Sequence, residues 1–133
     1  MEGTICNIYG PHTTPLKLNF LQMFKRLIEN NQKPLSVGGD FNIITTVLEK
    51  KGGIRRLDSE GQMFKKLIQE ENLVYIPTDN GILTWNNKQK GDRKISSRLE
   101  KFLISEDLNL GGLNLEASIL PRVGSDHSPI KLH

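Results

Sequence analysis

Apolar and polar residues alternate along the chain in a way that predicts short strands and two amphipathic helices. Residues 4–9 are rich in apolar side chains and form the first predicted strand, which Gly10 and Pro11 end. Thr14 followed by Pro15 is typical of a helix start, because proline suits the first helical position. The next apolar residues recur at helical spacing and predict a helix to about residue 31: Phe20, Leu21, Phe24, Leu27 and Ile28.

The remaining pattern adds a second helix and a series of strands. Ser59 to Gln62 match a capping box and predict the second helix. The polar, basic stretch 86–97 is expected to be an exposed loop. At the predicted strand 99–104, Arg98 and Glu100 are expected to face one side and Leu99 the other. Two helices among several strands predict an α+β fold in which strands and helices are layered together. The further predicted strands are 35–37, 73–76, 82–85, 99–104, 115–120 and 128–132.

Composition narrows the class of protein without naming a function. The 133 residues suit one domain or part of one, and 36% hydrophobic with 25% charged residues exclude wholesale disorder. A net charge of +3 is compatible with a polyanionic partner but does not require one. Cys6 is the only cysteine, so an intrachain disulfide and a Cys-based zinc site are excluded. The sequence has no secretory signal or membrane-spanning run, so we expect an intracellular protein.

Polar residues at the end of an apolar strand form the first candidate site, Gly39-Asp40-Phe41-Asn42. Side chains two apart on an extended segment face the same way, so Asp40 and Asn42 can converge while Phe41 packs oppositely. A carboxylate that accepts a proton from water, beside an amide that binds a phosphate oxygen, suits phosphodiester hydrolysis. The same residue types are equally typical of an ordinary turn.

Two further clusters gain meaning only in combination. Asp126 and His127 precede the last predicted strand, where Asp can ligate Mg²⁺ and His can donate to a phosphate oxygen. Glu100, on a strand, could orient His127 by accepting its ring proton. Taken singly, the first pair is more typical of a solvated loop, and Glu100 of an alternation of charges on a half-exposed strand.

Five motifs follow one another along the chain: Ile8-Tyr9-Gly10-Pro11, Gly39-Asp40-Phe41-Asn42, Thr84-Trp85, Ser97-Arg98-Leu99-Glu100-Lys101-Phe102 and Ser125-Asp126-His127. In this order they resemble the endonuclease/exonuclease/phosphatase family. Three further segments resemble the endonuclease of plant LINE-type (non-LTR) retrotransposons in particular: Glu49-Lys50-Lys51-Gly52-Gly53, Phe102-Leu103-Ile104-Ser105 and Leu120-Pro121-Arg122. The resemblance extends from about Ile5 to Leu132. It implies a four-layer α/β/β/α sandwich, of which residues 1–133 would be a partial domain, the C-terminal portion.

The resemblance also implies a role for each matching residue. Tyr9 would contact the phosphate, Asp40 would activate the attacking water, and Asn42 would bind the phosphate and hold the catalytic groups in place. Asp126 would lie at a divalent metal, Mg²⁺ or Mn²⁺. His127 would stabilise charge on the scissile phosphate, and Trp85 would pack near the site or simply in the core. The implied reaction is the nicking of chromosomal DNA, in the nucleus, by a polyprotein that also carries a reverse transcriptase domain.

Two departures from the family pattern predict impaired activity. The family domain is longer at its N-terminal side, and that part carries an early Asn and the Glu that is the principal metal ligand. Glu2 is too far from Tyr9 along an extended strand, roughly 23 Å, to replace it. The family has Asp where this chain has Glu100, and the extra methylene would displace or re-orient the ring of His127.

Basic residues flank the candidate site, and three of them are the best candidates for contacts to DNA phosphates: Arg55, Arg56 and Arg93. Solvated surface charge is the alternative for most basic residues individually. Two other functions stay open at this point. One is a non-catalytic transposon remnant or nucleic-acid-binding fragment. The other is a phosphodiesterase for an inositol phosphate or a sphingolipid, which the retrotransposon-like spacing disfavours.

Overall fold

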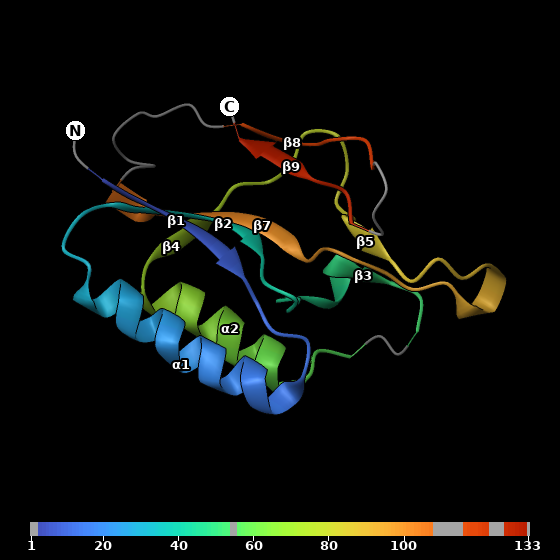
Figure 1. The fold of residues 1–133 in the computed structure, drawn as a ribbon, viewed down its shortest axis with the longest axis horizontal. Helices are drawn as coiled ribbons and strands as arrows, with labels where there is room; N and C mark the ends of the chain where they lie inside the picture. Colours follow the sequence, from blue (N-terminus) through green and yellow to red (C-terminus); the bar gives the residue numbers. More distant parts are fainter. Residues whose placement is uncertain (1–2, 54–55, 108–115, 123–126, 133) are drawn as a thin grey trace.

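The centre of the molecule is a four-stranded sheet with the strand order β1-β2-β7-β4 (Figure 1). The computed structural model describes residues 3–53, 56–107, 116–122 and 127–132. β1 (Thr4–Tyr9) and β2 (Leu35–Asp40) are parallel, and β7 (Glu100–Ser105) pairs antiparallel with both β2 and β4 (Leu73–Tyr75). The parallel pair needs a crossover connection, which the first helix supplies.

Two helices, α1 (Thr14–Asn30) and α2 (Ser59–Glu70), cover one face of this sheet (Figure 1). Their apolar stripes bury phenylalanines against the sheet, and the rings of Phe41 and Phe64 lie 5.1 Å apart. The predicted helices are therefore confirmed. None of the helices in the described ranges is long and apolar enough to cross a lipid bilayer.

The opposite face of the sheet carries a hairpin of β8 (Ala117–Ile119) and β9 (Ile130–Leu132). A smaller core of Ile76, Ile104 and Ala117 joins this hairpin to the sheet. Helices, a central sheet and a second sheet thus form three layers, which confirms the α+β class and the fold of a partial sandwich. On β1, Ile5 and Tyr9 point away from the helical core and are 88% and 76% exposed.

A third, small sheet with the order β3-β6-β5 lies beside the central one. It consists of β3 (Lys50–Lys51), β5 (Trp85–Asn86) and β6 (Ser96–Ser97). A short 3-10 helix, η1 (Val47–Glu49), precedes β3, and a second, η2 (Gly91–Arg93), lies between β5 and β6. The prediction of an exposed loop over 86–97 is wrong at both ends, because β5 and β6 pair there and bury both serines of β6. The strand predicted over 82–85 is reduced to the β5 pair.

The start of α2 differs from the predicted capping box. Asp58, not Ser59, is the N-cap residue, and its Oδ1 accepts a hydrogen bond of 2.8 Å from the backbone N–H of Gly61. A carboxylate is favoured here because it meets both an unpaired N–H and the positive end of the helix dipole. The register of the helix is therefore one residue earlier at its cap than the sequence pattern indicated.

Candidate active site

Strand register places three of the predicted site residues side by side, at one end of the strands of the central sheet. Tyr9 ends β1 and pairs with Asp40, which ends β2, and Asp40 in turn pairs with Glu100 at the start of β7. Adjacent strands lie only about 5 Å apart, so three residues far apart in sequence become near neighbours. This row is the foundation of the candidate site.

His127 joins the row from a different part of the chain. It forms an isolated β-bridge with Trp85, and the next residue, Ser128, donates a backbone hydrogen bond of 2.5 Å to the carbonyl of Thr84. This connection places His127 Nδ1 2.5 Å from Glu100 Oε1 and 3.7 Å from Asp40 Oδ2. The acidic side chains and the imidazole therefore converge.

Asn42 reaches the site by a route other than the one expected. β2 ends at Asp40, and Asn42 has a left-handed backbone with φ of 54°, so the argument from an extended strand does not hold. Its backbone N–H instead donates to Asp40 Oδ1 at 2.9 Å, and its Nδ2 donates to the carbonyl of Gly10 at 2.6 Å. Phe41 packs into the helical core, as expected. Asn42 therefore holds the Asp40 carboxylate and the end of β1 in place.

Together these residues line a cavity of about 850 Å³, large enough for a sugar–phosphate unit. Half-buried Lys17, in the first turns of α1, and exposed His12 contribute basic groups to its wall. The ring of Trp85 lies 6.4 Å from that of His127, so the tryptophan does pack at the site. The lining residues are Tyr9, His12, Lys17, Asp40, Asn42, Trp85, Leu99, Glu100 and His127.

Burial raises the pKa of the Glu100 carboxyl above its ordinary value. The Thr84 hydroxyl lowers this pKa, the nearby Asp40 carboxylate raises it, and His127 lowers it. Glu100 Oε2 is buried and has no hydrogen-bond partner among the described residues. Glu100 is thus held against His127 by a hydrogen bond through its other carboxylate oxygen, Oε1.

Thr84 is a site residue that the sequence interpretation did not assign. It is 1% exposed, and its hydroxyl accepts hydrogen bonds from the backbone N–H groups of Leu99, at 3.0 Å, and Glu100, at 3.2 Å. Its own carbonyl is the acceptor that anchors Ser128. Thr84 therefore ties both partners of the Glu100–His127 pair to one point, and the only signal in the sequence was its place beside Trp85 in a recognised motif.

The segment before β7 also differs from the prediction. Leu99 and Glu100 both line the candidate site, whereas Arg98 lies in a separate cavity. The reason is that the chain is irregular here: the hydroxyl of Thr84 takes two successive N–H groups, so strand alternation begins only at Glu100. Glu100, which stands where the family pattern has Asp, makes a direct hydrogen bond to His127. The displacement of the His127 ring by the longer side chain stays a prediction.

A divalent cation would find an incomplete set of ligands among the described residues. Asp40, Glu100 and His127 each offer a ligand atom, and these atoms lie within 4.8 Å of one another. Because Glu100 Oε1 and His127 Nδ1 are hydrogen-bonded to each other, Asp40 is the carboxylate best placed to hold an ion. Mg²⁺ is often held by one or two carboxylates with water and substrate phosphate, so this donor set fits a weak site. The predicted metal ligand Asp126 lies outside the described residues.

The two predicted DNA-binding residues that the structure describes, Arg56 and Arg93, are not part of this cluster. Arg56 lines a neighbouring cavity of about 250 Å³ that shares Lys17, Asn42, Trp85 and Leu99 with the candidate site. Arg93 ends η2 at the exposed tip between β5 and β6. Arg55 lies outside the described residues.

Comparison with known proteins adds a family to this geometry. The family model described as endonuclease-reverse transcriptase matches residues 3–131. The chain is similar to the endonuclease domain of TRAS1, a telomere-specific non-LTR retrotransposon, with a TM-score of 0.68 and 20% identity over 95% of this chain and 53% of that one. It is also similar to the 3′-5′ exonuclease NExo from Neisseria meningitidis, with a TM-score of 0.67 and 17% identity over 96% of this chain and 59% of that one.

The chain thus spans little more than half the length of these solved structures. Curated proteins gave no significant match. At such low identity the two structures establish the fold, while the family match covers almost the whole sequence. The chain therefore belongs to the endonuclease–reverse transcriptase family of the endonuclease/exonuclease/phosphatase fold.

Proposed function

We propose that this chain carries the reacting residues of a divalent-metal DNA endonuclease of retrotransposon origin. The observation that carries the proposal is the convergence of Asp40 and His127, 3.7 Å apart, at the mouth of a cavity of about 850 Å³. Because both side chains line one cavity, a phosphodiester bound there could meet both of them, the carboxylate acting on the attacking water and the imidazole on the developing charge.

Each residue then has a distinct task. Asp40, held by the N–H of Asn42, accepts a proton from the attacking water. His127, oriented by Glu100, stabilises the charge that develops on the phosphate. Tyr9, 76% exposed on the cavity wall, contacts the phosphate from the end of β1. Asn42 fixes the geometry through its two hydrogen bonds.

We assign the metal site to Asp126 together with Asp40, for Mg²⁺ or Mn²⁺. When bound, the ion supplies charge stabilisation at the phosphate and lowers the pKa of a bound water. Because Glu100 is committed to His127, we expect weak metal affinity and slow turnover. The donor set of the pocket supports these expectations.

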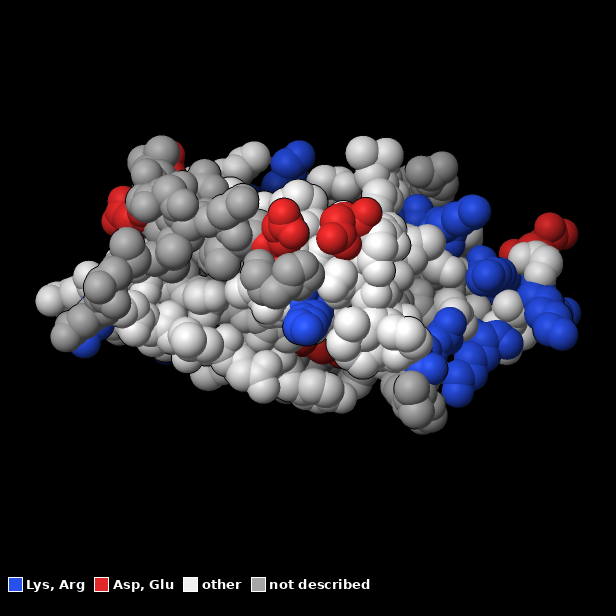
Figure 2. All heavy atoms as spheres, turned by 90° about the horizontal axis from the view of Figure 1, so that it is seen from above, with Lys and Arg blue, Asp and Glu red and all other residues white. Residues whose placement is uncertain are grey.

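The distribution of basic side chains on the surface supports DNA as the substrate. Figure 2 shows lysine and arginine side chains gathered at the end of the molecule that carries β3, β5, β6 and η2. Arg56 beside the site and Arg93 at the tip would hold phosphates on the flanking duplex, and we extend this role to Arg55. We further propose that the parent polyprotein contains a reverse transcriptase domain and acts in the nucleus, where its DNA substrate lies.

A plasmid-nicking assay with Mg²⁺ or Mn²⁺ tests the proposal. Slow, metal-dependent nicking by the chain should be abolished in Asp40→Ala. It should persist in Asp79→Ala, which removes an exposed carboxylate that does not line the cavity. Nicking that survives Asp40→Ala, or that does not need metal, would overturn the assignment.

A second function is favoured by one observation: among the described residues, Asp40 is the one carboxylate of the cluster that is not hydrogen-bonded to His127. If the site cannot hold an ion, the chain acts as a non-catalytic transposon remnant that binds nucleic acid. Binding of duplex DNA that weakens steeply with salt and with the double change Arg56→Ala, Arg93→Ala, in the complete absence of nicking, identifies this case.

A further inference from the structure

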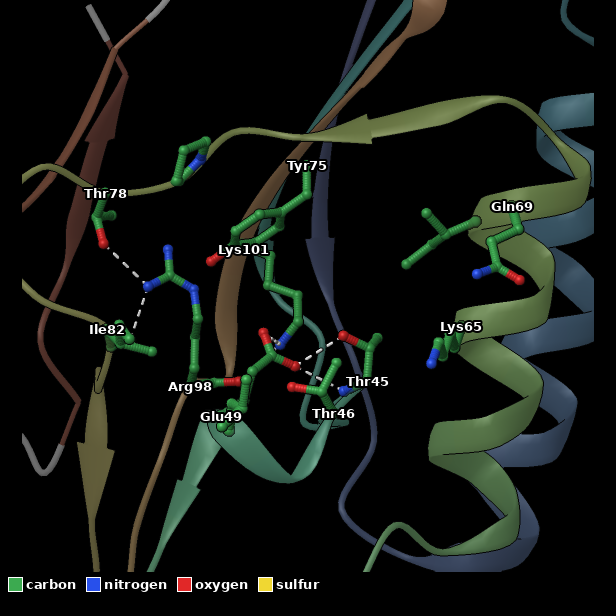
Figure 3. A pocket seen from close by; sticks show the side chains of 13 residues that line it. Thr45, Thr46, Glu49, Lys65, Gln69, Tyr75, Thr78, Ile82, Arg98 and Lys101 are labelled. Carbon is green, nitrogen blue, oxygen red and sulfur yellow. Dashed lines mark hydrogen bonds and ion pairs between the residues drawn. The ribbon is translucent and has the colours of Figure 1, made fainter.

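A second cavity lies apart from the candidate active site and shares no lining residue with it. Its volume is about 400 Å³, and it opens between α2, the segment 45–49 and the loop 77–82 (Figure 3). Arg98 and Lys101 rise from its floor, while Lys65 and Gln69 of α2 stand on the opposite side (Figure 3). This size suits a small organic molecule rather than a macromolecule.

The walls of this cavity are apolar. Leu48 and Ile82 remain 74% and 53% exposed although both are large aliphatic side chains, and both line the cavity. Ile68 from α2 and Pro77 complete the wall. An apolar ligand in this cavity would cover these exposed aliphatic side chains, and the removal of apolar surface from water favours its binding.

The floor of the cavity carries two buried cations, and the described lining residues include one acid. Arg98 and Lys101 are each 1% exposed, and Glu49 is the acid among the described lining residues. Glu49 serves Lys101, with an ion pair of 3.2 Å from Nζ to Oε2. Glu49 Oε1 accepts from the N–H and hydroxyl of Thr45. The buried guanidinium of Arg98 therefore has no carboxylate partner of its own among the described residues.

Only one of the three guanidinium nitrogens of Arg98 has a hydrogen-bond partner among the described residues. Its Nη1 donates to Thr78 Oγ1 at 3.0 Å and to the carbonyl of Ile82 at 2.7 Å (Figure 3). Its Nε and Nη2 are buried and lack a hydrogen-bond partner among the described residues. In a guanidinium these two N–H groups lie on one edge, and that edge matches the two oxygens of a carboxylate. Leaving both unpaired costs free energy that an anion would recover.

One side chain of the cavity wall, Tyr75, packs against the guanidinium of Arg98. Tyr75 is half-buried, and its ring centre lies 5.0 Å from the guanidinium carbon. An anion would reach the buried Nε and Nη2 only after this ring turned aside. Lys65, exposed on α2 at the rim, adds a further positive charge along the way in.

We propose that this cavity binds a small organic carboxylate with a flat apolar body. The carboxylate pairs with the Nε and Nη2 groups of Arg98 once Tyr75 has turned, and the apolar body lies between Ile68 and Ile82. The inference does not rest on the proposed nuclease function, because the two cavities have separate walls and the test measures binding alone.

A matched pair of probes tests the inference in titrations of the ¹⁵N-labelled chain. 2-Naphthoate carries the carboxylate, and 2-naphthalenemethanol has the same ring system without the charge. Naphthoate should bind at least about tenfold more tightly, because a charge-assisted pair to Arg98 is lost with the alcohol. The shifted amides should be those of the loop 77–82, the segment 45–49 and the end of α2.

Surface variants keep the test independent of folding. Lys65→Glu at the rim should weaken naphthoate binding several-fold, whereas Lys66→Glu, exposed on the same helix outside the cavity, should not. Arg98→Met, if it folds, should abolish the preference for naphthoate over the alcohol. Equal binding of the two probes, or naphthoate shifts centred on His127 and Trp85 instead, would overturn the inference.

Discussion

Replacing Thr84 by valine would remove a hydroxyl that organises the candidate site while keeping the side-chain volume. The Thr84 hydroxyl accepts from the backbone N–H groups of Leu99 and Glu100 in a position that is 1% exposed. Each buried N–H left without an acceptor costs roughly 1–3 kcal/mol. Because one oxygen serves both donors, we expect Thr84→Val to lower the free energy of unfolding by about 2–4 kcal/mol.

Urea unfolding followed by tryptophan fluorescence measures this loss, with Thr84→Ser as the matched control. Serine keeps the hydroxyl and removes one methyl group, so it should cost only about 1 kcal/mol. In a nicking assay the valine variant should also lose activity more than the serine variant, since Glu100 and the anchor of Ser128 are both attached to this residue. Valine and serine variants of equal stability would refute the reasoning.

Two other predictions follow from buried groups near the sheet. Burial lowers the pKa of Lys101 from 10.5 to about 8, so the unfolded chain binds more protons than the folded one between these values. Stability should therefore rise with pH across this window, by up to about 3 kcal/mol, and the rise should vanish in Lys101→Arg, whose guanidinium stays charged. A Cβ on Gly10 would lie 2.4 Å from the carbonyl oxygen of Phe41, so Gly10→Ala should cost about 2–3 kcal/mol by urea unfolding. Gly91→Ala, which meets open space at a φ of +64°, should cost only about 1 kcal/mol; equal costs would contradict this packing argument.

The elements with a long apolar period could be predicted from the sequence. β1 and both helices have enough residues for alternation or helical spacing to be visible, and Phe41 turned inward because it follows a buried strand. The pairing of β5 with β6 could not be predicted, because strands of two residues have no period to detect. Their pairing depends on contacts between distant segments, and the two buried serines of β6 look like loop residues when read singly.

The site shows the same division. Motif order and strand ends led to Asp40, Asn42, Glu100 and His127, and the structure brings these four together. The sequence could not reveal that Asn42 has a left-handed backbone, since that conformation goes with hydrogen bonds to Asp40 and to Gly10. The central role of a threonine hydroxyl was hidden for a related reason: a buried acceptor for two backbone N–H groups has no signature in the local sequence.

Binding of Mn²⁺ followed by paramagnetic broadening tests most directly whether Asp40 and His127 belong to one metal-dependent site. Trp85 is the only tryptophan, so its single indole N–H signal reports on the candidate cavity. At substoichiometric Mn²⁺, the account predicts that this signal and the ring signals of His127 broaden first, and that Asp40→Ala suppresses the effect. Broadening that begins instead at the acidic residues around Glu71, beside the opposite end of β2, would contradict it.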